Sequence, residues 1–349
     1  MKRCEAILLI ACFALALAPR LAHLGGPLDE PMWRQTDTAY MARRMMRESP
    51  PDLLRPKAPY RGTNDVKAAE FPIYPWAAAM AYKAVGRESL PAARVMTLLF
   101  FCGATLFLGL GLAEMGGARL GWWTAAVYAL LPLGIPYSRM VHPDFSIVFF
   151  SHLFFFGLLR FLNRGGWAWY ALAIAGGVGA FLMKAPYAFF YGLPAAAWVL
   201  LRREGWTVRN LGALAFVLAL PLAAGMWFNA HRIALEAPFA PSLVYPMKWT
   251  AESSMGQFFG TVAQRVDGER WLLLLRRVLI LVATPAGILL ALAPLLWPSR
   301  ADGRVRLSLA SLATGAVIYV LLVFPMVTSG HEYYCIPLLA PVAALAGWS

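Results

Sequence analysis

The succession of long apolar runs along the chain is the feature that most constrains its fold. Of its 349 residues 60% are hydrophobic, and the mean hydropathy is +0.59. A helix needs about 20 mainly apolar residues to cross the hydrocarbon core of a bilayer, and many of the runs approach that length. A soluble protein of this size is not so apolar. The sequence therefore predicts an all-α polytopic membrane protein.

Ten membrane-spanning helices are expected, at residues 5–23, 94–113, 119–136, 145–162, 168–183, 187–201, 211–229, 277–297, 307–327 and 335–349. The first run ends in Ala16-Leu17-Ala18, which resembles a cleavage site, but Pro19 follows directly. We interpret this run as a retained signal anchor with its N-terminus in the cytoplasm. The run Ile73–Val85 is too short to span easily and carries Lys83, so it is predicted to lie in the interface as a juxtamembrane helix.

The distribution of arginines fixes the predicted orientation, because cytoplasmic loops carry an excess of Lys and Arg. With the spans above, the cytoplasmic turns receive Arg119, Arg164, Arg202, Arg203, Arg209, Arg300, Arg304 and Arg306, whereas the short outer turns receive only Arg139 and Lys184. Residues 24–93 then form a first outer loop, and residues 230–276 form a second large outer loop.

The net charge of +13 would suggest nucleic acid as a partner in a soluble protein. Here much of the positive charge falls in loops between apolar runs, which fits membrane orientation and phosphate-bearing lipids, so we expect no nucleic acid. The four cysteines lie in or beside apolar runs without metal-ligand spacing. They indicate neither a metal site nor a disulfide framework.

The first outer loop opens with an unusually polar stretch, residues 29–44. It contains Asp29, Glu30 and Asp37 together with Arg34 and Arg43, in a chain of which only 14% is charged. The Pro31 break and the Thr36-Asp37 pair predict a turn followed by a helix that starts near Asp37. Asp37 is then either a helix cap or a reactive carboxylate that faces a site.

Further polar groups collect at the outer ends of the predicted spans. They are Arg139, His142 and Asp144 in one turn, Lys184 in a second, and His331, Glu332, Tyr333 and Tyr334 in a third. Singly, Asp144 could cap a helix and Lys184 could extend to the interface. Their convergence with Asp37 on one face indicates a site. His152, in the middle of a span, is interpreted as a packing residue with satisfied hydrogen bonds.

Several motifs resemble those of C-type membrane glycosyltransferases. They are the acidic first outer loop, the element Glu70-Phe71-Pro72-Ile73-Tyr74-Pro75 and the Arg139-x4-Asp144 spacing. The chain is most similar to bacterial glycosyltransferase family 39, which is related to protein O-mannosyltransferases and lipid A aminoarabinose transferases. The run Trp33-Arg34-Gln35-Thr36-Asp37-Thr38-Ala39, followed by Ala42-Arg43, resembles a bacterial branch of that family. The resemblance covers most of the chain and implies one transmembrane domain over residues 1–349.

The resemblance also implies the reaction: transfer of a sugar, with inversion, from a polyprenyl-phosphate-linked donor to a lipid, glycan or protein acceptor. The site would open on the periplasmic or extracellular side of the bacterial inner membrane. Such a transfer needs a carboxylate base and cations that hold the phosphate leaving group. The expected catalytic residues are Asp37, Asp29, Glu30 and Asp144, and the expected substrate-binding residues are Arg34, Arg43, Glu70, Arg139, His142, Lys184, His331 and Tyr333. No metal ligands are assigned, and a divalent cation stays open as a cofactor. The family's Asp-Glu pair corresponds either to Asp29-Glu30 or to Asp37-Thr38, so the base is Asp37 or a member of the earlier pair.

Three other functions compete with this interpretation. An oligosaccharide ligase would use a polyprenyl-pyrophosphate carrier. A lipid or sugar transporter would place polar groups near the membrane midplane and often shows paired repeats, and neither feature is visible here. A membrane scaffold would need no clustered acid and base in its outer loops.

Overall fold

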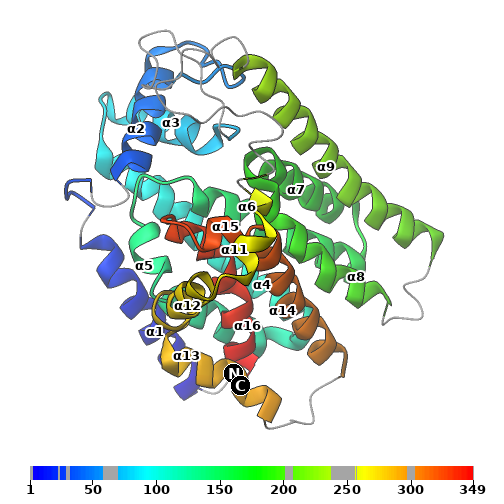
Figure 1. The fold of residues 1–349 in the computed structure, drawn as a ribbon. Coiled ribbons are helices and arrows are strands. Elements are labelled where there is room, and N and C mark those ends of the chain that lie inside the picture. Colours follow the sequence, from blue (N-terminus) through cyan, green and yellow to red (C-terminus); the bar gives the residue numbers. More distant parts are fainter. Residues whose placement is uncertain are drawn as a thin grey trace.

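The computed structural model describes residues 3–22, 24–28, 32–57, 70–200, 207–236, 256, 258–296 and 303–348. Over these residues every regular element is a helix (Figure 1). The first seven are α1 (Arg3–Leu21), α2 (Met32–Arg47), α3 (Ile73–Val85), α4 (Leu90–Leu130), α5 (Gly134–Tyr137), α6 (Asp144–Arg164) and α7 (Trp167–Ala188). They are followed by α8 (Gly192–Leu200), α9 (Val208–Glu236), α11 (Val262–Val266), α12 (Gly268–Arg277), α13 (Thr284–Leu296), α14 (Gly303–Leu322), α15 (Phe324–Val327) and α16 (Leu339–Trp348).

The α6–α7 hairpin forms the centre of the bundle. Two glycines allow its backbones to approach closely: a Cβ on Gly176 would lie 2.5 Å from the Phe154 nitrogen, and one on Gly157 would lie 2.8 Å from the Ala173 nitrogen. These two contacts fix an antiparallel register. Asp144 lies ten residues before Phe154, and Lys184 lies eight residues after Gly176. The register therefore brings the Asp144 carboxylate and the Lys184 ammonium to the same end of the hairpin.

Helix α4 folds back on itself at Gly117, whose φ of 87° and ψ of 169° are not helical. A Cβ on Gly121 would lie 2.3 Å from the Gly109 carbonyl oxygen, a contact that a straight helix cannot make across twelve residues. The two expected spans, 94–113 and 119–136, therefore run antiparallel over the parts that lie in α4, residues 94–113 and 119–130.

The α7–α8 segment also turns back. Lys184 has a non-helical backbone, and Pro186 follows it inside α7. Near the end of α8, Trp198 Nε1 donates a hydrogen bond of 2.7 Å to Asn163 Oδ1 at the end of α6. The end of α8 is therefore level with the α6–α7 turn, as expected if 168–183 and 187–201 cross in opposite directions.

Six described helices are long and apolar enough to cross a membrane, or seven if one bent pair counts as a single span. The chain is thus a multi-pass membrane protein, but the predicted count of ten is not confirmed. The returning arms are short: α8 has 9 residues and α16 has 10. The range expected as span 277–297 is bent: a π-helical turn at Val278–Val282 is followed by a 92° bend before α13, and this bent pair is the one that may count as a single span.

Residues 24–93, predicted as the first outer loop, carry α2 and α3, which lie at one end of the molecule in Figure 1, away from the start of α1 and the end of α16. Helix α3 has the bounds predicted for the juxtamembrane helix. Ala42 and Met45 of α2 pack with Tyr74 and Tyr82 of α3 in a separate hydrophobic cluster. The predicted helix start near Asp37 is wrong, because α2 begins at Met32. Of the second outer loop, the part at 237–255 lies outside the described residues.

Ion pairs mark the opposite end of the bundle. Glu114, at the end of the first arm of α4, pairs with Arg160 and lies 3.4 Å from Arg164. Glu5 in α1 lies 2.8 Å from Arg119 in the α4 turn. At the other end of α1, Arg20 donates a hydrogen bond of 2.7 Å to Ser138, just after α5. Helix α1 is therefore attached to the bundle at both ends.

Candidate functional site

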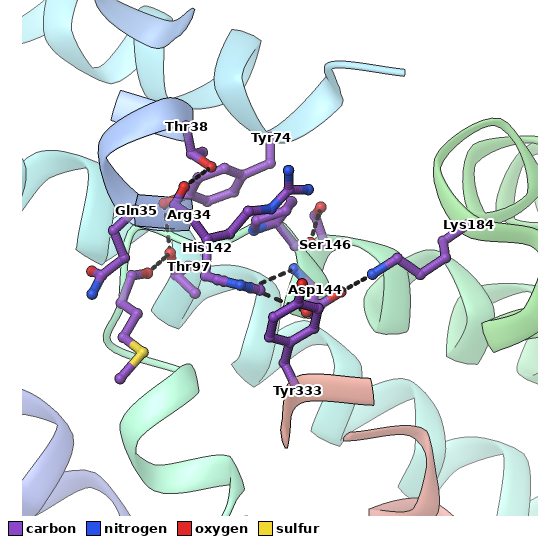
Figure 2. A network of polar contacts seen from close by, with 12 residues as sticks. Arg34, Gln35, Thr38, Tyr74, Thr97, His142, Asp144, Ser146, Lys184 and Tyr333 are labelled. Carbon is purple, nitrogen blue, oxygen red and sulfur yellow. Dashed lines mark hydrogen bonds and ion pairs between the residues drawn. The ribbon is translucent and has the colours of Figure 1, made fainter. Parts of the chain in front are cut away.

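Four charged side chains meet where α6 begins and α7 breaks. Lys184 Nζ lies 2.8 Å from Asp144 Oδ1 and 3.6 Å from Glu70 Oε1. Glu70 Oε2 in turn lies 2.5 Å from a terminal nitrogen of Arg34 on α2. Figure 2 shows Lys184 and Asp144 pointing toward each other from neighbouring helices. The four groups form an alternating chain of two carboxylates and two cations, which links the first outer loop to the central hairpin.

A proline accounts for the docking of Glu70 beside Lys184. Pro186 has no N–H, so the carbonyl of Leu182 loses its partner four residues ahead in the helix. The backbone N–H of Phe71 donates to that carbonyl at 3.3 Å. The outer loop thus supplies the hydrogen bond that α7 cannot make, and the Glu70 carboxylate is placed against the Lys184 ammonium.

Hydrogen bonds also attach α2 and α3 to the turn before α6. Gln35 Oε1 accepts a hydrogen bond of 3.0 Å from the Val141 N–H. The Thr97 hydroxyl on α4 donates to the Met140 carbonyl at 2.6 Å and contacts the Tyr74 hydroxyl at 2.7 Å (Figure 2). The turn is therefore held from two sides, which fixes the approach of Arg34 to Glu70.

Three tyrosine rings surround the Lys184 ammonium, which is within 4.6 Å of the ring centres of Tyr187 and Tyr334 and 5.3 Å of that of Tyr333. The residue is only 8% exposed. Cation–π attraction adds to the two carboxylates in keeping this cation stable away from water. Lys184 does not extend to the interface as an unpaired cation.

His142 lies beside the same carboxylate, with Nδ1 3.1 Å from Asp144 Oδ2. Burial lowers the pKa of His142, and the attraction of Asp144 does not offset that effect. Arg34 shows the opposite balance: burial acts to lower its pKa, but the Glu70 carboxylate outweighs burial and raises it. His142 is consequently neutral at pH 7, while Arg34 is charged.

A line of aromatic rings leads from this cluster to the surface. His142 lies 4.9 Å from Tyr333, Tyr333 lies 5.4 Å from His331, and His331 lies 5.6 Å from Trp33, all measured between ring centres. Burial lowers the pKa of His331, with nearby cations as further causes. Trp33 was not among the predicted site residues, and Tyr334 was predicted as part of the third polar turn but without a binding role. The only sequence signal for Trp33 was its place in the Trp-Arg-Gln run.

Asp37 is buried, with 3% exposure, in the second turn of α2. It is therefore not the cap of that helix. It follows Trp33 by four residues and Arg34 by three, and residues at these spacings lie on the same side of a helix. Asp29 and Glu30, the other predicted bases, lie outside the described residues.

Two predicted binding residues lie elsewhere. Arg43 is exposed and pairs with Glu88 at 3.3 Å, at the turn between α3 and α4. Arg139 donates a hydrogen bond of 3.1 Å to the Pro19 carbonyl at the end of α1. Neither contact involves the cluster around Lys184. His152 accepts or donates hydrogen bonds to the Ala104 carbonyl (2.8 Å) and the Tyr191 hydroxyl (2.6 Å), as expected of a packing residue.

Within the described ranges, no group of three or more His, Cys, Asp or Glu could hold a metal ion. The two carboxylates of the cluster, Glu70 and Asp144, already face Arg34 and Lys184.

Solved structures of membrane enzymes share this fold. The crystal structure of ArnT from Cupriavidus metallidurans bound to undecaprenyl phosphate matches with a TM-score of 0.65 and 16% identity, over 99% of this chain and 59% of that one. The archaeal oligosaccharyltransferase AglB from Archaeoglobus fulgidus, in complex with an inhibitory peptide and a dolichol-phosphate, matches with a TM-score of 0.56 and 14% identity, over 99% of this chain and 50% of that one. The chain has the C-type glycosyltransferase fold and spans between half and three fifths of the length of these two chains.

A narrower relationship comes from the sequence of the central region. Residues 67–227 match the family model described as dolichyl-phosphate-mannose-protein mannosyltransferase. This range contains Glu70, Asp144 and Lys184. A search of curated proteins gives no match. The family match and the shared fold confirm the predicted resemblance to C-type glycosyltransferases related to the protein mannosyltransferases.

Proposed function

We propose that this protein is a membrane glycosyltransferase. It moves a sugar from a polyprenyl-phosphate-linked donor to a lipid, glycan or protein acceptor at the outer face of the bacterial inner membrane. The observation that carries the proposal is the Glu70 carboxylate held between Arg34 and Lys184. The matches to ArnT with undecaprenyl phosphate and to AglB with dolichol-phosphate add support.

Binding of the donor phosphate follows from that arrangement. Arg34 and Lys184 hold a carboxylate through charge-assisted contacts, and the same two cations suit the oxygens of a phosphate. The phosphate takes the place of Glu70 between them. Asp144 stays on the far side of Lys184 and keeps its ammonium charged and oriented. As the bond to the sugar breaks, the two cations stabilise the growing charge on the leaving phosphate.

The chemical step requires a base on the acceptor side. Asp37 is the first candidate, because it lies on the same side of α2 as Arg34. The acceptor oxygen attacks the anomeric carbon opposite the phosphate, its proton passes to Asp37, and the carrier leaves as polyprenyl phosphate. Attack from the opposite face inverts the configuration at that carbon. Asp29 and Glu30 are the alternative bases, and His331 and Tyr333 would supply hydrogen bonds to the substrates.

The second candidate function is the oligosaccharide ligase, which would transfer from a polyprenyl-pyrophosphate carrier. Purified protein in liposomes would be incubated with labelled polyprenyl-monophosphate and polyprenyl-pyrophosphate sugars and with envelope acceptors, with and without added divalent cations. Arg43→Gln, at an exposed pair remote from the cluster, serves as a folded control. Transfer from monophosphate donors alone supports the proposal. Transfer from pyrophosphate donors alone indicates the ligase, and transfer from neither contradicts both.

A further inference from the structure

Trp33 is an exposed aromatic side chain at the edge of a buried charged cluster. It is 43% exposed, whereas Tyr333, two rings further in, is 5% exposed. Its ring packs at a tilt of 55° against His331, which comes from the loop before the short helix Glu332–Leu338. Two elements distant in sequence therefore build one aromatic surface beside the cluster.

The position of Trp33 on α2 relates this surface to the proposed reaction. Arg34, its neighbour in sequence, contacts Glu70, and Asp37 lies one turn further along the same side of the helix. A phosphate between Arg34 and Lys184 carries its sugar on the next atom. The sugar ring therefore has to lie close to Arg34 and next to the base. Trp33 lies one turn before Asp37 on the same side of α2, and its ring centre is 5.6 Å from that of His331.

We propose that Trp33, backed by His331, stacks on the sugar ring of the lipid-linked donor and thereby sets which sugar the enzyme accepts. This inference rests on the proposed function and names its sugar subsite. An aromatic face carries negative charge density and attracts the slightly positive C–H groups on one face of a pyranose. A sugar with a continuous C–H face packs flat on Trp33, whereas one with an axial hydroxyl on that face does not.

A second role for an exposed Trp in a membrane protein is anchoring at the lipid interface. Trp76 provides a matched control for that role, because it is 41% exposed and lies on α3 of the same outer loop. If exposure to lipid were the whole function of Trp33, then Trp33→Ala and Trp76→Ala would have similar effects.

The test is a binding measurement with two ligands, polyprenyl phosphate carrying a sugar and polyprenyl phosphate without one. For Trp33→Ala we expect affinity for the sugar-bearing carrier to fall about five- to tenfold, with affinity for the bare carrier changed less than about twofold. Trp33→Phe should recover most of the loss, and Trp76→Ala should change neither affinity.

If Trp33→Ala lost affinity equally for both carriers, or for neither, the assignment of Trp33 to the sugar would be overturned. Failure of the proposed function gives a different result, because the unaltered protein would then bind neither carrier. Melting temperatures of the parent and the three variants in the same detergent verify that they are folded. An unchanged affinity for the bare carrier verifies that the phosphate site of each variant is intact.

Discussion

Lys184 and Asp144 are buried together, so removing Lys184 leaves the Asp144 carboxylate without the cation that lies 2.8 Å from it. Breaking a buried pair in this way costs about 3–5 kcal/mol, whereas replacing both partners with neutral groups costs much less. We therefore expect Lys184→Met to lower the melting temperature strongly. The double variant Lys184→Met/Asp144→Asn should recover most of that loss.

Donor binding separates the two roles of Lys184. If its ammonium holds the carrier phosphate, the double variant should bind the donor at least about tenfold more weakly, because a hydrogen bond to a charged group is worth about 1.5–3 kcal/mol. Asp144→Asn alone gives the matched reference. A stable double variant with normal donor affinity would assign Lys184 a structural role only.

Asp37→Asn tests the base. The substitution preserves size and removes the proton acceptor, and general-base catalysis contributes typically 10²–10⁴-fold. We expect normal folding, normal donor affinity and transfer slowed at least about a hundredfold. Asp29→Asn and Glu30→Gln, measured in the same assay, should be milder. The reverse order of severity would assign the base to the earlier pair.

For single residues, the sequence predicts which side chains belong to the site better than it predicts which groups they contact. Motifs single out Arg34, Glu70, His142, Asp144 and Lys184, and the structure brings all five together. Arg43 and Arg139 come from equally polar stretches, yet Arg43 pairs with Glu88 and Arg139 donates to the Pro19 carbonyl, both away from the cluster. The Phe71–Leu182 hydrogen bond joins residues 111 positions apart, and no local pattern encodes such a contact.

Among the elements, the fold-back of α4 gives the clearest prediction. A methyl group at position 121 would meet the backbone carbonyl of Gly109 at 2.3 Å, and a backbone atom cannot move aside as a side chain can. Overpacking of this kind costs about 1–3 kcal/mol. Gly121→Ala should therefore lower the melting temperature in detergent.

Gly212→Ala in α9 is the matched control, because nothing lies within 4 Å of its added methyl. Ala is favoured over Gly in helices by about 0.8–1.0 kcal/mol, so this variant should be as stable as the parent or more so. Equal melting of both variants would contradict the close approach of the two α4 arms.

The elements also show which local signals are reliable. Ile73–Val85 was predictable, because apolar residues there end at Gly86, which adopts the left-handed conformation that ends helices. The start of α2 was placed five residues late. Arg34 and Gln35 find partners on Glu70 and Val141, and these tertiary contacts stabilise a first turn that the Thr36-Asp37 signal does not predict.

For the whole molecule, orientation in the membrane is the decisive prediction. In a variant with Cys4, Cys12, Cys102 and Cys335 replaced by serine, a cysteine at exposed Ser49 should react with an impermeant thiol reagent in intact cells. A cysteine at exposed Gly303 should react only after the cells are opened. The opposite pattern would place the candidate site on the cytoplasmic side and remove the basis for a lipid-linked donor at the outer face.

The two attachments of α1 bear on the membrane itself. Glu5 is bound to Arg119 at one end and Arg20 to Ser138 at the other, fifteen residues away along the helix. That separation is about 22 Å at 1.5 Å per residue, shorter than a typical hydrocarbon core of about 30 Å. Because both polar ends are fixed to the bundle, the helix cannot slide to match a thicker bilayer. We therefore expect the depth and tilt of α1 to change little when the acyl-chain length of the surrounding lipids is varied.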